Sequence, residues 1–104
     1  MTDSTPDPAA PDAATMEAMA QLFKALADPT RLRILHFLGD REQAAGAIAR
    51  ALAMSPSAVS HQLAFLHGSR ILRRRRAGRS VFYALDDDHV RALFAQGLEH
   101  ATHV

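Results

Sequence analysis

Apolar residues recur at helical spacing along most of this chain. When apolar side chains fall at i, i+3, i+4 and i+7 they share one face of a helix, and the pattern predicts an amphipathic segment. Asp28-Pro29 and Ser55-Pro56 each pair an N-cap residue with a proline suited to the first helical turn, and Gly39 is typical of a helix C-terminus. The predicted helices are residues 15–27, 29–38, 44–53, 56–67 and a C-terminal stretch around 90–101, with residues 41–43 as a connector.

A different spacing follows the fourth predicted helix. Residues 71–76 and 80–85 are strand-like runs, and Gly78 lies in the short connection between them, which predicts a β-hairpin. Before the hairpin, two short helices are joined by a tight turn, and the second has a small, polar outer face, as in a helix-turn-helix motif. A hairpin directly after such a helix is a wing. The predicted fold class is therefore mainly α with a small β-hairpin wing, a winged helix-turn-helix.

The composition limits the class of protein. The 104 residues fit one small domain, short enough that oligomerisation would help to bury a sufficient core. Residues 1–14, rich in Pro, Ala and Asp, predict a disordered tail, and residues 15–104 a DNA-binding and dimerisation domain. The absence of cysteine excludes disulfides and thiolate metal sites. With no transmembrane stretch and no signal-peptide pattern, we expect a cytoplasmic protein without a membrane partner.

The net charge of +1 conceals a segregation of charge along the chain. Outside residues 1–14 there are 12 basic and 8 acidic side chains, and six arginines lie between positions 70 and 79 with no acid among them. A charge run is more often a solvated face than a binding site, but on a wing it fits the phosphate backbone of DNA. The candidate DNA-binding residues are Ser57, Ser60, His61 and Gln62 on the second helix of the motif, with Arg73, Arg74, Arg75, Arg76 and Arg79 on the wing.

The C-terminal helix has metal-ligating side chains at both ends: Asp87 and His89 at one, His100 and His103 at the other. The two pairs lie on nearly the same face but roughly 16 Å apart along the helix, too far to share an ion within one chain. Two such helices, antiparallel about a two-fold axis, would bring the pairs of two chains together. Each residue alone fits a simpler interpretation, as a helix cap or a solvated histidine. As a set, on one apolar seam, they predict an inter-subunit metal site.

These elements, in this order, resemble the ArsR/SmtB family of winged-helix metalloregulators. The resemblance runs from about Leu22 to His103 and is carried by LFKALADPTRLRIL (22–35), MSPSAVSHQLAFL (54–66) and RRAGRSVFYAL (75–85). One departure follows the second helix of the motif, where many members place a small residue and Gly. Here the sequence is Ser69-Arg70, with Gly68 one place earlier.

The resemblance implies a homodimer through the N- and C-terminal helices and a function in metal-dependent repression. The apo dimer would bind operator DNA, and Zn(II) or Co(II) at Asp87, His89, His100 and His103 would weaken that binding and derepress metal efflux or homeostasis genes. Four nitrogen and oxygen ligands suit tetrahedral zinc or cobalt and leave no open position, so neither an enzyme nor a small-molecule substrate is expected. The alternative is a nickel-responsive regulator, with Ni(II) taking extra ligands from the N-terminal tail, or a metal-independent one.

Overall fold

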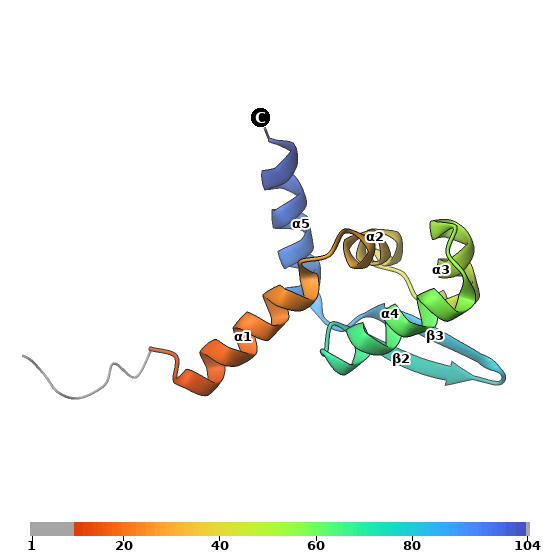
Figure 1. Cartoon of the computed structure of the whole chain (residues 1–104), viewed down its shortest axis with the longest axis horizontal. Coiled ribbons are helices and arrows are strands. Elements are labelled where there is room, and N and C mark those ends of the chain that lie inside the picture. The colour runs from red at the N-terminus through yellow and green to blue at the C-terminus, as the bar shows by residue number, and fades with distance from the viewer. Residues whose placement is uncertain (1–9, 104) are drawn as a thin grey trace, which may run out of the picture.

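The computed structural model describes residues 10–103, and its elements follow the predicted order, with one added strand (Figure 1). The elements are α1 (Ala13–Leu26), α2 (Pro29–Leu38), β1 (Gln43–Ala44), α3 (Ala45–Leu52), α4 (Pro56–Gly68), β2 (Leu72–Ala77), β3 (Ser80–Leu85) and α5 (Asp88–Thr102). Most of the expected disordered tail, residues 1–14, lies outside the described residues. Helix α1 begins at Ala13, slightly before the predicted residue 15.

Four helices begin at a side chain that accepts a hydrogen bond from the backbone of the first turn. The caps are Asp12, Asp28, Ser55 and Asp87, each in extended conformation, and the accepted N–H belongs to the residue three positions on. Such caps satisfy N–H groups that have no partner within the helix. Helix α2 ends at Gly39, whose φ of 55° lies in the region that favours glycine. The predicted starts at Asp28-Pro29 and Ser55-Pro56 and the end at Gly39 are confirmed.

The three strands form an antiparallel sheet in the order β1-β3-β2. Strand β1 was not predicted: its residues were assigned to the connector 41–43 and to the start of the next helix. Gln43 pairs with Tyr83 and Ala44 with Phe82, so Ala44 is extended and α3 begins one residue later. A strand of two residues has no periodicity to detect, which is why sequence pattern alone misses it.

The hydrophobic core lies between α2, α3, α4 and the inner end of the hairpin. Its fully buried large side chains are Ile34, Leu35, Leu38, Ile48, Val59, Leu63, Leu66, Ile71, Leu72 and Leu85. Burying a side chain of this size stabilises a fold by about 1.5–3 kcal/mol relative to leaving it exposed. This core fixes α4 against the hairpin and therefore sets the position of the wing relative to the helix-turn-helix.

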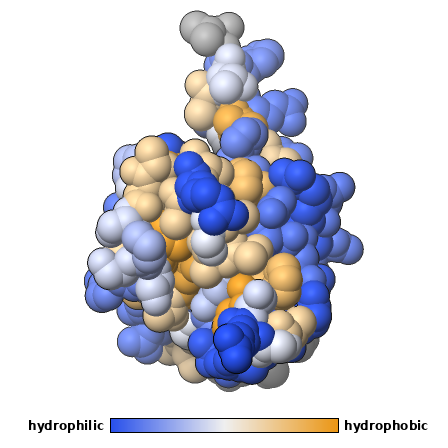
Figure 2. Space-filling view, turned by 90° about the vertical axis from the view of Figure 1, so that its right-hand side faces the viewer, coloured by the Kyte–Doolittle hydropathy of each residue, from blue (hydrophilic) through white to orange (hydrophobic). Residues whose placement is uncertain are grey.

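Helices α1 and α5 leave this body in different directions (Figure 1). Figure 2 shows the end of α5 standing clear above the rest of the molecule. Large apolar side chains remain exposed on both helices, among them Met19 at 45%, Phe23 at 48% and Leu98 at 45%. We call α1 and α5 the arms and the α2–β3 portion the body. Among the helices of residues 10–103, none is long and apolar enough to cross a membrane.

Candidate nucleic-acid interface and metal-binding residues

Helix α4 turns a small polar surface outward. Its cap Ser55 accepts a hydrogen bond from Ala58 N–H at 3.1 Å, and the apolar residues at positions 59, 63 and 66 are buried. Ser57, Ser60 and His61 are exposed, as the sequence predicted. Short side chains let a helix approach base edges closely, and hydroxyl and imidazole groups supply hydrogen-bonding atoms.

Gln62 differs from the other candidates on α4. It is half-buried, and its Oε1 accepts a hydrogen bond from Arg31 Nε on α2 at 3.2 Å. The same guanidinium lies over the ring of Phe65, with Cζ 4.1 Å from the ring centroid. Gln62 is therefore held by the protein itself, with its amide nitrogen left for another partner.

The four consecutive arginines of β2 alternate between the two faces of the wing. Cross-strand pairing places Arg73 opposite Ala84 and Arg75 opposite Phe82, so these two arginines share one face. Arg75 donates to both carboxylate oxygens of Glu42, with the shortest contact from Nη2 to Oε1 at 2.7 Å, and its Cζ lies 5.0 Å from the ring centroid of Phe82. The hydrogen bond from Arg75 lowers the pKa of the Glu42 carboxyl and raises that of Arg75.

Arg73 is also engaged within the protein, since its Nη1 donates to the Asp86 carbonyl at 3.3 Å. On the opposite face, Arg74 and Arg76 line a recess of about 240 Å³ with Val81 and Tyr83. Within residues 10–103, neither of those two guanidinium groups has a hydrogen-bond or ion-pair partner. The arginines on one face of the wing, Arg73 and Arg75, therefore donate hydrogen bonds within the protein, whereas Arg74 and Arg76 on the other face are open to solvent.

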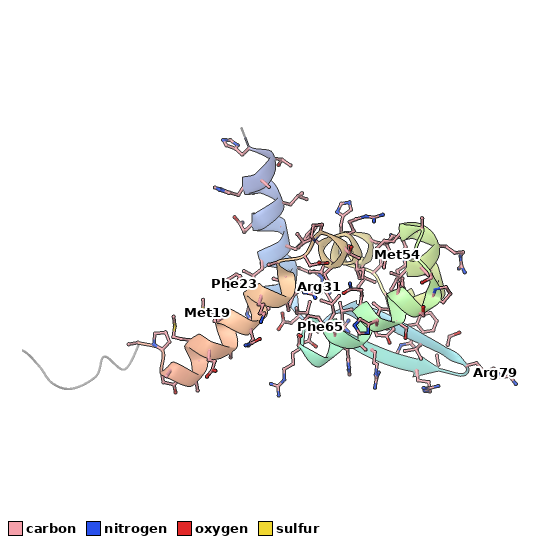
Figure 3. The ribbon with its side chains drawn as sticks, viewed as in Figure 1. Met19, Phe23, Arg31, Met54, Phe65 and Arg79 are labelled. Carbon is pink, nitrogen blue, oxygen red and sulfur yellow. The ribbon has the colours of Figure 1, made fainter. Side chains whose placement is uncertain are left out.

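The tip and the base of the wing both depend on left-handed backbone. Gly78 has φ 62° in the turn, and Figure 3 shows Arg79 extending from the tip. At the base, Arg70 has φ 61°, an unusual conformation for a residue with a side chain. Helix α4 ends as Ile71 N–H donates to the Leu66 carbonyl at 3.0 Å, and Arg70 takes the place where a glycine is common. This is the departure noted at Ser69-Arg70.

Asp87 has two roles at the start of α5. Its Oδ1 accepts from Val90 N–H at 2.9 Å, and its Oδ2 lies 3.4 Å from Nδ1 of His89. The backbone hydrogen bond from Val90 is the main cause that lowers the pKa of Asp87, with the His89 side chain adding to it. Because the Asp87 side chain is 47% exposed and the His89 side chain is 94% exposed, both groups are open to a ligand from outside.

His100 and His103 lie one turn apart at the far end of α5, and both are exposed. The structure brings Asp87 together with His89, but it leaves the two pairs at opposite ends of the helix. No group of three or more His, Asp or Glu side chains suited to a metal occurs within residues 10–103 of the single chain. This agrees with the calculated separation of the pairs, and the inter-subunit site stays a prediction.

A helix-turn-helix followed by a basic wing defines a winged-helix DNA-binding domain. Residues 28–74, from the cap of α2 into β2, match the family model described as bacterial regulatory protein, arsR family. The chain belongs to this ArsR family, whose members are transcriptional regulators and not enzymes.

Individual relatives agree with this assignment. The transcriptional repressor SmtB homolog of Synechocystis is 44% identical over 84 residues, which span 81% of this chain and 64% of that protein. The HTH-type transcriptional regulator KmtR of Mycobacterium tuberculosis is 37% identical over 97% of this chain and 76% of its own length. A homodimeric winged helix-turn-helix DNA-binding domain from Mycobacterium bovis, a possible ArsR-family regulator, superimposes with a TM-score of 0.83 at 32% identity, covering 96% of this chain and 90% of that one.

Two residues that contact candidate DNA-binding side chains were not predicted from the sequence. Arg31 donates a hydrogen bond to Gln62, and Glu42 accepts hydrogen bonds from Arg75. Both contacts join residues more than thirty positions apart, which no local spacing indicates. One indirect signal existed for Arg31. It is a cation two residues after Pro29, which has no N–H to donate to the carbonyls at the end of the preceding helix, so those carbonyls need another donor.

Proposed function

We propose that this chain is a metal-responsive transcriptional repressor that binds operator DNA as a homodimer and releases it when zinc or cobalt binds between the subunits. The observation that carries the proposal is the placement of two incomplete ligand pairs at the two ends of one exposed helix. Each pair lacks the ligands that the other supplies. A second copy of the chain is the simplest source of the missing ones.

The support for a dimer is the apolar surface of the arms. A groove of about 710 Å³ lies between α1, α2 and α5, lined chiefly by apolar side chains that include Phe23, Leu32, Phe94 and Leu98. Apolar patches of this kind on a small protein mark an interaction surface. The homodimeric relative favours a second copy as the occupant. In such a dimer the arms of two chains would bury what each leaves exposed.

The ligand set fits zinc or cobalt. With the α5 helices antiparallel about a two-fold axis, Asp87 and His89 would face His100 and His103 of the partner subunit. Three imidazoles and a carboxylate form a closed tetrahedral set, typical of a site that regulates rather than catalyses. Asp87 would keep its hydrogen bond from Val90 and offer Oδ2 to the ion, so metal binding need not disturb the helix cap.

DNA binding follows from the two α4 helices of the dimer, which would enter successive major grooves about 34 Å apart. Metal binding would favour a dimer geometry in which this spacing is lost. Metal and operator then oppose each other reciprocally, with a coupling free energy of about 1–3 kcal/mol. The regulated genes would be those of metal efflux or homeostasis, as the family resemblance implies.

Fluorescence anisotropy of a DNA duplex with and without zinc tests the proposal. The duplex is one selected by the protein from a random pool. We expect zinc to weaken binding about 5- to 150-fold in the wild-type protein. In His100→Ala the zinc effect and the zinc stoichiometry should both fall, whereas His67→Gln, an imidazole outside the ligand set, should keep both.

Cobalt absorption intensity then identifies the geometry, since four-coordinate cobalt absorbs far more strongly than six-coordinate cobalt. A six-coordinate spectrum, with nickel as the more effective ion, would favour the nickel-responsive alternative. Unchanged DNA affinity with every metal would favour the metal-independent one. If His100→Ala responds to zinc like the wild-type protein, the proposed site is wrong.

A further inference from the structure

Arg31 lies where α1, α2 and α4 meet. Figure 3 shows it between the end of α1 and Phe65 of α4. Its Nη1 donates to the Ala25 carbonyl at 3.0 Å, and its Nε donates to Gln62 Oε1 at 3.2 Å. One planar group thus contacts the last turn of an arm and a candidate DNA-binding side chain at the same time.

The contact with α1 has a specific cause in the sequence. In a continuous helix the Ala25 carbonyl would accept from the N–H of residue 29, but residue 29 is proline and has no N–H. Ala25 is 1% exposed, so water is a poor substitute. The guanidinium supplies the missing donor, and its positive charge lies at the negative end of the α1 dipole.

The contact with α4 fixes an orientation. Gln62 Oε1 and the ring of Phe65 lie one turn apart, and Arg31 engages both, the ring at 4.1 Å from Cζ. Phe65 is 42% exposed, so its own burial holds it weakly. A hydrogen bond in the guanidinium plane and a ring against its face together restrict how α4 can rotate.

We propose that Arg31 is a positioning residue that couples the α1 arm to α4 and orients Gln62 for operator recognition. This inference rests on the proposed operator binding. It requires arginine specifically, because a lysine ammonium is a point charge that cannot donate in two directions within one plane and stack on a ring. Movement of α1 in the dimer would then reach the DNA-contacting helix through a single side chain.

The test compares Arg31→Lys with Arg41→Lys in the full chain, both of which keep the positive charge. Arg41 is an apt control because it is exposed and lies more loosely over Phe37, at 5.9 Å. Affinities are measured without metal for the selected duplex and for a scrambled duplex of the same composition. We expect Arg31→Lys to reduce the preference for the selected duplex about tenfold, because the variant loses a hydrogen bond from a charged group. The affinity for the scrambled duplex and the salt dependence of binding should stay unchanged. Arg41→Lys should keep the preference.

Two outcomes overturn the proposal: an unchanged preference in Arg31→Lys, or an equal loss of affinity for both duplexes with a shallower salt dependence, which would indicate a phosphate contact. If the wild-type protein itself shows no preference for the selected duplex, operator binding fails instead. Amide hydrogen exchange then decides on Arg31 without DNA. Arg31→Lys should speed exchange both at residues 25–28 and along α4, and a change confined to one of them would refute the coupling.

Should Arg31→Lys fold poorly, Phe65→Leu provides the second variant. It removes the aromatic face while leaving both hydrogen bonds of Arg31 in place. We expect a smaller loss of preference in the same direction, and an unaltered preference in a folded Phe65→Leu protein would count against the stacking half of the proposal.

Discussion

The body and the arms bury their apolar side chains to very different extents. Helix α4 alone has three buried residues, Val59, Leu63 and Leu66, whereas α1 has only Ala25 and α5 only Val90. The surface proposed for DNA is therefore positioned by a core that one chain completes. The surface proposed for metal lies on α5, a helix that one chain leaves half covered. Metal binding at the arms, as proposed, would change the geometry of the dimer without unfolding the body that carries the DNA-binding surface.

The largest effect should come from a cavity in the body. Leu63 is fully buried, and Leu63→Ala should lower the free energy of unfolding by about 2–5 kcal/mol, a large share of the ~5–15 kcal/mol that a domain possesses. Urea unfolding at several protein concentrations provides the measurement. Leu98→Ala on α5 is the matched change in an arm, and its effect should depend on protein concentration. A cost below about 1 kcal/mol for Leu63→Ala would contradict the division between body and arms.

The next effect concerns assembly. Leu98 is 45% exposed and lines the apolar groove, so Leu98→Glu should place a charge in the dimer interface and yield a folded monomer. Sedimentation measures the mass, and circular dichroism checks that the helices remain. Operator affinity should fall on the order of 10²-fold, because one chain engages only one half-site. Ala92→Glu, exposed on the other side of α5, should stay dimeric, and a Leu98→Glu dimer would show that the groove has another use.

The same contrast explains what the sequence could predict. The α2 and α4 starts, the end of α2 and the hairpin were all predicted, because caps, prolines and apolar spacing act within a few residues. Strand β1 was missed because its extended conformation is imposed by β3, through the Gln43–Tyr83 pairing. Arg70 at φ 61° was also unexpected, since the left-handed position there usually carries glycine.

The candidate site divides in a similar way. Residue type and spacing singled out Asp87, His89, His100 and His103 as candidate ligands, and they also predicted that one chain cannot bring all four together, in agreement with the described residues. Sequence did not distinguish among the wing arginines, because the partners that separate them, Glu42 and the Asp86 carbonyl, are set by the tertiary fold. Their roles on DNA remain predictions.

A smaller effect should separate the two faces of the wing. Arg76 is without an internal partner in the described part of the chain, while Arg73 donates to the Asp86 carbonyl. Arg76→Gln should weaken binding to selected and scrambled duplexes alike and reduce the slope of log affinity against log salt by about one. Arg73→Gln should change the slope less. Anisotropy over a salt series measures both, and equal slopes for the two variants would show that the internal contact of Arg73 is given up on DNA.

The smallest effect should come from Glu42, which pairs with Arg75 within the protein. Glu42→Gln removes the ion pair and one negative charge beside the wing, so affinity for either duplex should rise slightly and the salt dependence should steepen, by at most about one further phosphate contact. A fall in affinity would instead mean that the pair is needed to orient the wing.

The pH dependence of the stability that this ion pair contributes has a definite sign. The hydrogen bond from Arg75 lowers the pKa of Glu42, so whatever stability the pair gives is fully present above the ordinary glutamate range and is lost as the pH falls through the lowered pKa. Thermal unfolding of wild type and Glu42→Gln should therefore differ near neutral pH and converge in acid. A difference that persists below the glutamate range would have to arise from something other than this carboxylate.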